Sequence, residues 1–318
     1  MKRFLSLLAA ALALVGLTAC GASPSAPPSE TISVVATIFP IYDWVTQLSR
    51  DAGEADVTLL LDTGVDMHSF QPSAADMVLL SSCDLFIYVG GESDAWVEDA
   101  LAEAKNPDMV VLDLMDILGD RAVKEETVEG MTALPEDDPA PDEHVWLSVQ
   151  NARLFCSSIA EALSSLDPAH AETYAANARA YDASLAALDD KYRSAVANAS
   201  YDTLLFGDRF PFRYLCEDYG LTYYAAFPGC SAETEASFET VAFLAAKLDE
   251  LRLPAVLIID GSDGRIAETV IQSSQSRSAS VLTLDSMQSV TAQDIAAGTS
   301  YLTLMENDLA VLTRALNG

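Results

Sequence analysis

The chain has 318 residues, of which 17 are lysine or arginine and 48 are aspartate or glutamate, so its formal net charge is −31. A surface this acidic repels nucleic acid and anionic lipid headgroups and attracts cations, although solubility outside a cell would account for it equally well. The charge therefore argues against nucleic acid as a partner without identifying a ligand.

The first 20 residues have the three parts of a secretory signal. Lys2 and Arg3 form a basic start, the apolar run 4–17 is shorter than a membrane span, and small residues precede Cys20. The ending Leu-Thr-Ala-Cys resembles the bacterial lipobox, in which the cysteine is lipidated and becomes the mature N-terminus. An ordinary signal peptide with an accidental cysteine is the alternative. We predict a lipoprotein signal peptide over 1–20 and lipidation at Cys20.

Residues 21–31 are rich in proline, serine and alanine and have little to bury, so we expect a flexible tether between the lipid and the folded part. Removing the signal takes away two basic residues, and the mature charge is 15 − 48 = −33. About 285 residues remain, enough for two lobes that each have a core.

The remaining chain alternates apolar runs typical of strands with helix-like segments. The predicted strands are 32–39, 57–61, 85–89, 109–114, 203–206, 222–227, 255–259 and 280–284. The predicted helices between them include 41–51, 94–104, 149–166, 237–251 and 265–275. Such alternation, with nearly continuous apolar strands, predicts an α/β fold of two (βα)4 lobes, each with a parallel sheet covered on both faces.

One long helix is predicted between the lobes. Asp167 supplies an N-cap and Pro168 a favourable first position, and apolar residues follow at spacings of three and four. A helix from Pro168 to about Asn198 would be roughly 46 Å long and would limit bending between the lobes. We therefore divide the chain into an N-terminal lobe (32–166), a rigid backbone helix (167–199) and a C-terminal lobe (200–318). His170, in the first helical turn, is interpreted as a solvated surface residue.

The other two histidines, His68 and His144, follow the second and fourth predicted strands. Because ligands of open parallel sheets bind beyond the carboxyl ends of the strands, these imidazoles should lie at the same edge. The equivalent loops of the second lobe contain Asp208 and Asp285. A lone loop histidine is more often structural, but two imidazoles with one or two carboxylates across a cleft indicate a divalent transition-metal site.

Two segments carry a resemblance to a known family. Residues 67–73 read Met-His-Ser-Phe-Gln-Pro-Ser, and residues 142–147 read Asp-Glu-His-Val-Trp-Leu. They resemble the His-x-Tyr-Glu-Pro and Asp-Pro-His-Val-Trp-Leu motifs of the metal-binding lipoproteins of ABC importers, the zinc and manganese receptors once described as streptococcal adhesins. The likeness covers 32–318.

The resemblance implies that His68 and His144 are metal ligands. It also implies a monomeric, non-enzymatic receptor that is lipid-anchored on the extracytoplasmic face of the membrane and delivers its ion to an ABC permease with an ATPase subunit.

The second lobe departs from the family pattern. The third ligand is usually a histidine or glutamate upstream of Tyr-Gly-Leu, and counting back from Tyr219 places Arg209 there, which stays protonated and cannot coordinate a cation. Either Asp208 takes the role or the lobe contributes differently. Asp285 resembles the carboxylate of manganese-type members and is preferred to Asp208. Cys230, a soft ligand, is the least favoured candidate.

Arg209 could instead pair with an acidic residue of the cleft and either hold the cleft shut or order an acidic ligand; a plain salt bridge between the lobes is the alternative. The candidate partners are Asp285, Asp260 and Glu233. Glu233 could also accept hydrogen bonds behind the ligands or belong to a polar loop.

Two histidines with two aspartates would suit manganese by softness, whereas the general affinity order favours zinc. We predict Zn²⁺ first and Mn²⁺ as the alternative.

Besides Cys20, the mature chain has four cysteines, without a Cys-x-x-Cys spacing that would indicate structural zinc. Because the protein is exported, we expect a disulfide between Cys216 and Cys230, with buried free thiols as the alternative.

Other functions fit the sequence less well. A zinc hydrolase would need a compact motif such as His-Glu-x-x-His, and neither that motif nor a Gly-x-Ser-x-Gly elbow nor a phosphate loop occurs. An adhesin or scaffold, or a binder of a non-metal or chelated ligand with a degenerate metal site, remains the alternative to metal capture.

Overall fold

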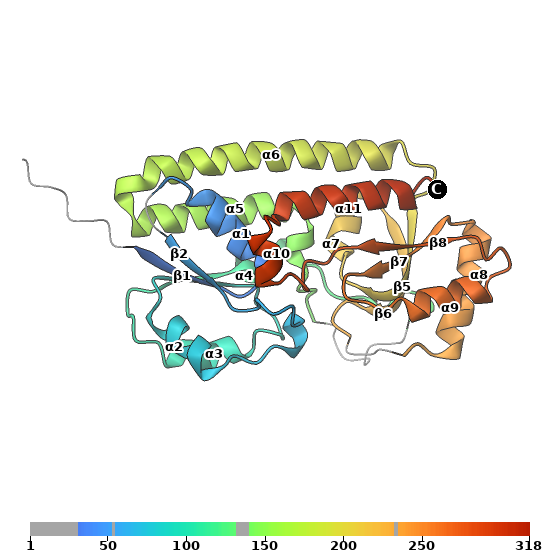
Figure 1. The fold of residues 1–318 in the computed structure, drawn as a ribbon, viewed down its shortest axis with the longest axis horizontal. Coiled ribbons are helices and arrows are strands. Elements are labelled where there is room, and N and C mark those ends of the chain that lie inside the picture. The colour runs from blue at the N-terminus through green and yellow to red at the C-terminus, as the bar shows by residue number, and fades with distance from the viewer. Residues whose placement is uncertain (1–30, 53–54, 132–139, 232–234) are drawn as a thin grey trace, which may run out of the picture. The chain divides into compact units, whose positions relative to one another are not determined.

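The computed structural model describes residues 31–52, 55–131, 140–231 and 235–318. The predicted signal peptide with Cys20, nearly all of the tether and Glu233 lie outside these residues. The described chain contains two four-stranded sheets, each flanked by helices (Figure 1). This arrangement confirms the predicted α/β fold with two parallel sheets.

The first sheet has the strand order β2-β1-β3-β4, and every pair is parallel. Its core is built from buried β-branched and aromatic residues, with Val34 paired to Val57 on one side and to Leu85 on the other. Its strands are β1 (Ile32–Ala36), β2 (Ala55–Leu59), β3 (Leu85–Tyr88) and β4 (Val110–Asp113). Its helices are α1 (Phe39–Leu48), α2 (Ala74–Ser82), α3 (Trp96–Ala102) and α4 (Leu114–Leu118).

The second sheet repeats this topology in the order β6-β5-β7-β8. All five residues of β7 are buried, as expected for a strand covered on both faces. Its strands are β5 (Thr203–Phe210), β6 (Thr222–Pro228), β7 (Ala255–Ile259) and β8 (Ser280–Leu284). Its helices are α7 (Arg213–Tyr219), α8 (Phe238–Leu251), α9 (Arg265–Ser273) and α10 (Ala292–Ala296).

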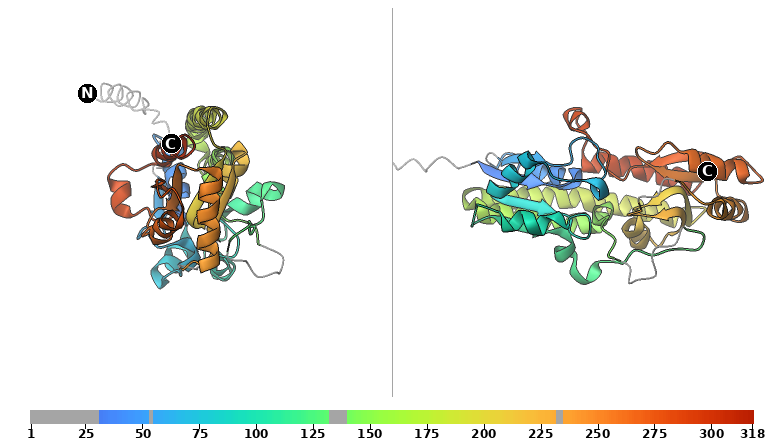
Figure 2. Two further views of the ribbon diagram at one scale, coloured as in Figure 1. Left: turned by 90° about the vertical axis from the view of Figure 1, so that its right-hand side faces the viewer. Right: turned by 90° about the horizontal axis from the view of Figure 1, so that it is seen from below.

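The predicted long helix is α6 (Ala171–Ala197), which follows a 3-10 turn over Pro168–His170 and runs past both sheets (Figure 1). α5 (Val149–Leu166) packs beside it, and the last helix, α11 (Tyr301–Ala315), lies along it as well (Figure 2). His170 is one-third exposed and pairs with Asp167. The long helix is confirmed, while the domain boundaries drawn around it stay a prediction.

α11 also reaches the first lobe. The Tyr301 backbone N–H donates to Asp43 Oδ2 of α1 at 3.0 Å, and the Tyr301 hydroxyl donates to the carbonyl oxygen of Trp146 at 2.8 Å. Asp43 is 5% exposed and also accepts from Tyr181 of α6 and from Gln47. This one buried carboxylate therefore joins α1, α6 and α11.

A half-buried carboxylate, that of Asp218, makes the stability depend on pH. Asp218 of α7 accepts a hydrogen bond from Ser148 Oγ at 2.6 Å. Ser148 Oγ in turn caps α5, because it accepts the backbone N–H of Asn151. Burial raises the pKa of Asp218 to about 6. Between the unfolded pKa near 4 and this value, the folded state holds a proton that the unfolded state has lost, so the free energy of unfolding falls as the pH rises.

Asp218→Asn should remove this loss, because an amide oxygen can still accept from Ser148 but does not ionise. Urea unfolding between pH 4 and 7 should show the decline reduced by about 1 to 3 kcal/mol. Asp190→Asn, at an exposed position on α6, controls for the loss of a charge. Parallel declines in the wild type and Asp218→Asn would contradict the assignment.

Candidate metal centre

His68 lies in a short 3-10 helix, Met67–Ser69, in the loop after β2. Asp66 caps this helix, because its Oδ1 accepts the His68 backbone N–H at 3.0 Å. The ring nitrogen Nδ1 lies 2.7 Å from Ser93 Oγ in the loop after β3. The cap and this contact fix the ring so that its other nitrogen, Nε2, faces His144.

His144 precedes the 3-10 helix Val145–Leu147 and is completely buried. Asp142 Oδ1 accepts from the His144 backbone N–H at 2.8 Å and from its ring Nδ1 at 2.9 Å. A carboxylate on Nδ1 holds the proton there and leaves the lone pair on Nε2, as in many carboxylate–histidine–metal arrangements. The local sequence Asp-x-His therefore prepares the imidazole for coordination.

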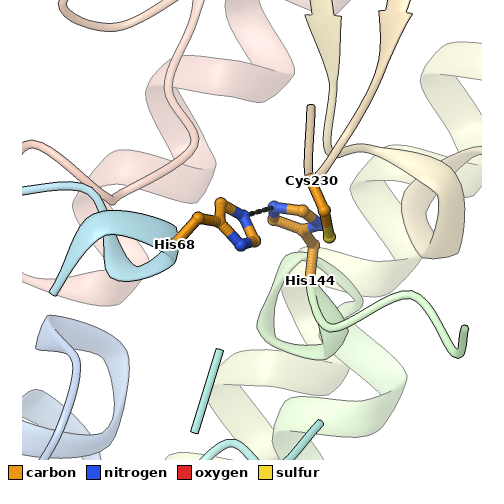
Figure 3. A group of neighbouring side chains, drawn as sticks. All are labelled: His68, His144 and Cys230. Carbon is orange, nitrogen blue, oxygen red and sulfur yellow. Dashed lines mark hydrogen bonds between the residues drawn. The ribbon is translucent and has the colours of Figure 1, made fainter. Parts of the chain in front are cut away.

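The two predicted histidines meet, although 76 positions separate them in the chain (Figure 3). Their Nε2 atoms are 3.2 Å apart. Zinc binds imidazole nitrogens at about 2.0–2.1 Å, so two nitrogens of a tetrahedral site are about 3.3–3.4 Å apart. The pair therefore fits one ion with little movement of either ring.

The electrostatics of the pair favour coordination. Burial lowers the pKa of His68 to about 3, so its ring is neutral at physiological pH, as a metal ligand must be. Glu143 Oε2 is buried without a hydrogen-bond partner and lies 3.6 Å from His68 Nδ1. A carboxylate on this side of the ring favours a proton on Nδ1 and leaves the Nε2 lone pair free for an ion.

The second lobe brings a thiol to the pair. One ring nitrogen of each histidine and the Sγ of Cys230 lie within 4.8 Å of one another (Figure 3). Cys230 comes two residues after β6, and burial together with the charge of Glu125 raises the pKa of its thiol. In the sequence, Cys230 could be recognised as a candidate because it lies just beyond the carboxyl end of a predicted parallel strand, as the two histidines do.

The expected disulfide is wrong. Cys216 is buried in α7, and both it and Cys230 are free thiols, as are Cys83 and Cys156. Because burial raises the pKa of the thiol of Cys216, this residue behaves as a small apolar core residue.

The structure places the two predicted aspartates elsewhere. Asp208 is inside β5 rather than in a loop after it, and its carboxylate accepts from the backbone amides of Arg209 and Ile259. The carboxylate of Asp285 accepts from the Met287 amide. Neither belongs to the group formed by the two histidines and Cys230.

Arg209 pairs with Asp66, not with the expected Asp285 or Asp260. Its Nη2 lies 2.5 Å from Asp66 Oδ2, and the two side chains are only 20% and 26% exposed. Asp260 instead accepts hydrogen bonds from the backbone and hydroxyl groups of Ser286 and Ser289. Arg209 therefore forms the plain salt bridge between the lobes.

An open cavity of about 500 Å³ adjoins this salt bridge and carries Asp66, Asp208, Arg209 and Asp260 on its wall. The two histidines and Cys230 do not line it. The cavity thus gives solvent access to the interlobe ion pair from the second lobe's strand ends.

A family model described as "Zinc-uptake complex component A periplasmic" matches residues 34–315. The chain belongs to this family. The zinc-binding lipoprotein AdcA of Streptococcus pneumoniae serotype 4 is 29% identical over 98% of this chain, which spans only 60% of AdcA. The high-affinity zinc uptake system protein ZnuA of Bacillus subtilis is 26% identical over 99% of this chain and 98% of its own length.

Solved structures agree with this assignment. The Zn(II)-bound ZnuA-like domain of S. pneumoniae AdcA superposes with a TM-score of 0.71 at 26% identity, covering 91% of this chain and all of that domain. In the described part of this chain, no helix combines the length and apolarity needed to cross a bilayer.

The Arg209–Asp66 pair should contribute measurably to stability. A double-mutant cycle with Arg209→Gln and Asp66→Asn should give a coupling of about 1 to 2 kcal/mol in urea unfolding, between the values for exposed and fully buried pairs. Asparagine can still cap the His68 helix, so the cycle isolates the ion pair. The exposed pair Arg265–Asp263 should show no measurable coupling. Equal, negligible couplings for both pairs would contradict this assignment.

Proposed function

We propose that the mature chain is an extracytoplasmic solute-binding protein that captures a divalent transition metal between its lobes. The ion is zinc, with manganese as the alternative, and the protein delivers it to an ABC permease driven by an ATPase. The observation that carries the proposal is the facing Nε2 pair of His68 and His144, each ring fixed at its other nitrogen.

The relatives support zinc as the ion. The B. subtilis relative, which matches over nearly its whole length, is named for high-affinity zinc uptake, and AdcA is named a zinc-binding lipoprotein. The family is that of a transport component rather than an enzyme. Lipid attachment at Cys20, with 21–31 as the tether, would keep the receptor beside its permease.

The two histidines, both from the first lobe, differ in their access to solvent. His144 is completely buried, whereas the His68 side chain keeps 13% exposure, so we expect an ion to reach His68 first. Because α6 packs along both lobes, closure around the ion would be small. The permease would favour the open state and so lower the affinity for the ion, a shift between two populations of one protein.

Calorimetric titration of metal-stripped residues 22–318 tests the proposal. We expect one tight zinc site, which His68→Ala/His144→Ala abolishes because both nitrogen ligands are lost. His170→Ala should bind like the wild type, since His170 pairs with Asp167 in the first turn of the long helix. Zinc binding that survives the double variant, or no tight binding by the wild type, would contradict the proposal.

A further inference from the structure

We propose that Cys230 supplies the third protein ligand as a thiolate, so that the centre selects borderline and soft ions of the zinc class and discriminates against manganese, magnesium and calcium. This inference rests on the proposed function. It replaces the expected carboxylate ligands of the second lobe with a sulfur ligand.

The thiol of Cys230 lies close to a ring nitrogen of each histidine. Among the described residues, this is the one group of three or more histidine, cysteine or acidic side chains whose ligand atoms approach one another this closely. A tetrahedral site with Zn–N near 2.1 Å and Zn–S near 2.3 Å needs nitrogen and sulfur about 3.6 Å apart. Rotation of the Cys230 side chain or a small closure of the lobes would bring Sγ to that distance.

The backbone at Gly229 and Cys230 is held close to His144. Gly229 packs so tightly on His144 that an added Cβ would lie 2.9 Å from the ring atom Cε1 and 2.9 Å from the Phe210 carbonyl oxygen. The next residue is Cys230, and its backbone N–H donates to Glu125 Oε1 at 2.9 Å. The chain is therefore held against the imidazole at the point where the thiol begins.

The other candidate ligands of the second lobe already have partners elsewhere. Arg209, at the family's usual third-ligand position, is a cation paired with Asp66. The carboxylates of Asp208 and Asp285 accept from backbone amides outside the histidine group. Among the described residues of the second lobe, Cys230 is therefore the candidate ligand that lies beside the two histidines.

Binding of the ion to Cys230 releases the proton of the thiol. On binding, the thiol transfers its proton to solvent and the sulfur donates an electron pair to the ion, so one proton leaves for each metal bound. Two neutral imidazoles and one thiolate leave a divalent ion with one positive charge, which the neighbouring carboxylates of Asp142 and Glu143 can offset. Thiolate favours zinc and other soft or borderline ions, whereas manganese prefers oxygen ligands.

Cobalt is the spectroscopic probe. Under reducing conditions, Co²⁺ added to metal-stripped residues 22–318 should produce a sulfur-to-cobalt charge-transfer band in the near ultraviolet. Cys230→Ser should lose the band, while Cys216→Ala should keep it, because Cys216 is a buried thiol outside the histidine group. The wild-type spectrum alone tests the proposal even if a variant folds poorly.

Competition titrations test selectivity. Cys230→Ser should weaken zinc binding at least about tenfold, since losing even a supporting partner of a ligand typically costs 10- to 100-fold. Cys230→Asp should reduce the preference for zinc over manganese, because it restores an oxygen ligand.

Two outcomes would overturn the inference while leaving the proposed function standing. One is a wild-type cobalt complex without the sulfur band. The other is an unchanged zinc affinity in Cys230→Ser, and a loss of affinity in Glu233→Gln would then assign the third ligand to that carboxylate instead. Failure of the wild type to bind zinc at all would instead overturn the proposed function, and the inference with it.

Discussion

The candidate metal centre depends on how Nδ1 of each of the two histidines is held. Asp142 fixes Nδ1 of His144 and Ser93 contacts Nδ1 of His68, so both Nε2 atoms are directed at each other 3.2 Å apart. Without these contacts, each imidazole could rotate, and coordination would have to overcome the lost freedom. The loops that supply these contacts all follow parallel strands of one sheet, which is why residues distant in sequence converge.

The position of the second lobe depends on a helical layer. The buried carboxylate of Asp43 accepts from α6 and α11 at once, so α1 of the first lobe and the last helix of the chain share one hydrogen-bonding centre. Trp146, two residues after His144, donates its indole N–H to the Ser286 carbonyl oxygen at 3.0 Å. The lobes are thus connected both behind the site and beside it, and this connection limits how far they can separate.

The sequence predicts elements well where apolar runs have clear ends. The strands 255–259 and 280–284 and the helix 149–166 have the predicted bounds, because proline, serine or aspartate borders each run. β5 was predicted to stop at 206, since Gly207, Asp208 and Arg209 look like a turn. A register shift between Phe206 and Arg209 instead lets the strand continue to Phe210.

The longer β5 explains why Asp208 and Arg209 do not join the two histidines. The two histidines follow strands of one parallel sheet, so their convergence could be predicted from strand order. Asp208 and Arg209 were assigned to a loop, but they lie in a bulged strand, where backbone amides and Asp66 engage their side chains. The approach of Cys230 depends on the packing of Gly229 against His144, a tertiary contact that no local pattern records.

The structure points to the facing imidazoles of His68 and His144 as the ligands of the ion. A crystal structure of zinc-loaded residues 22–318, with an anomalous difference map measured at the zinc edge, tests it most directly. We expect one strong peak about 2.0–2.1 Å from Nε2 of both His68 and His144. A peak in the cavity beside Arg209 and Asp208, with the two histidines uncoordinated, would contradict it.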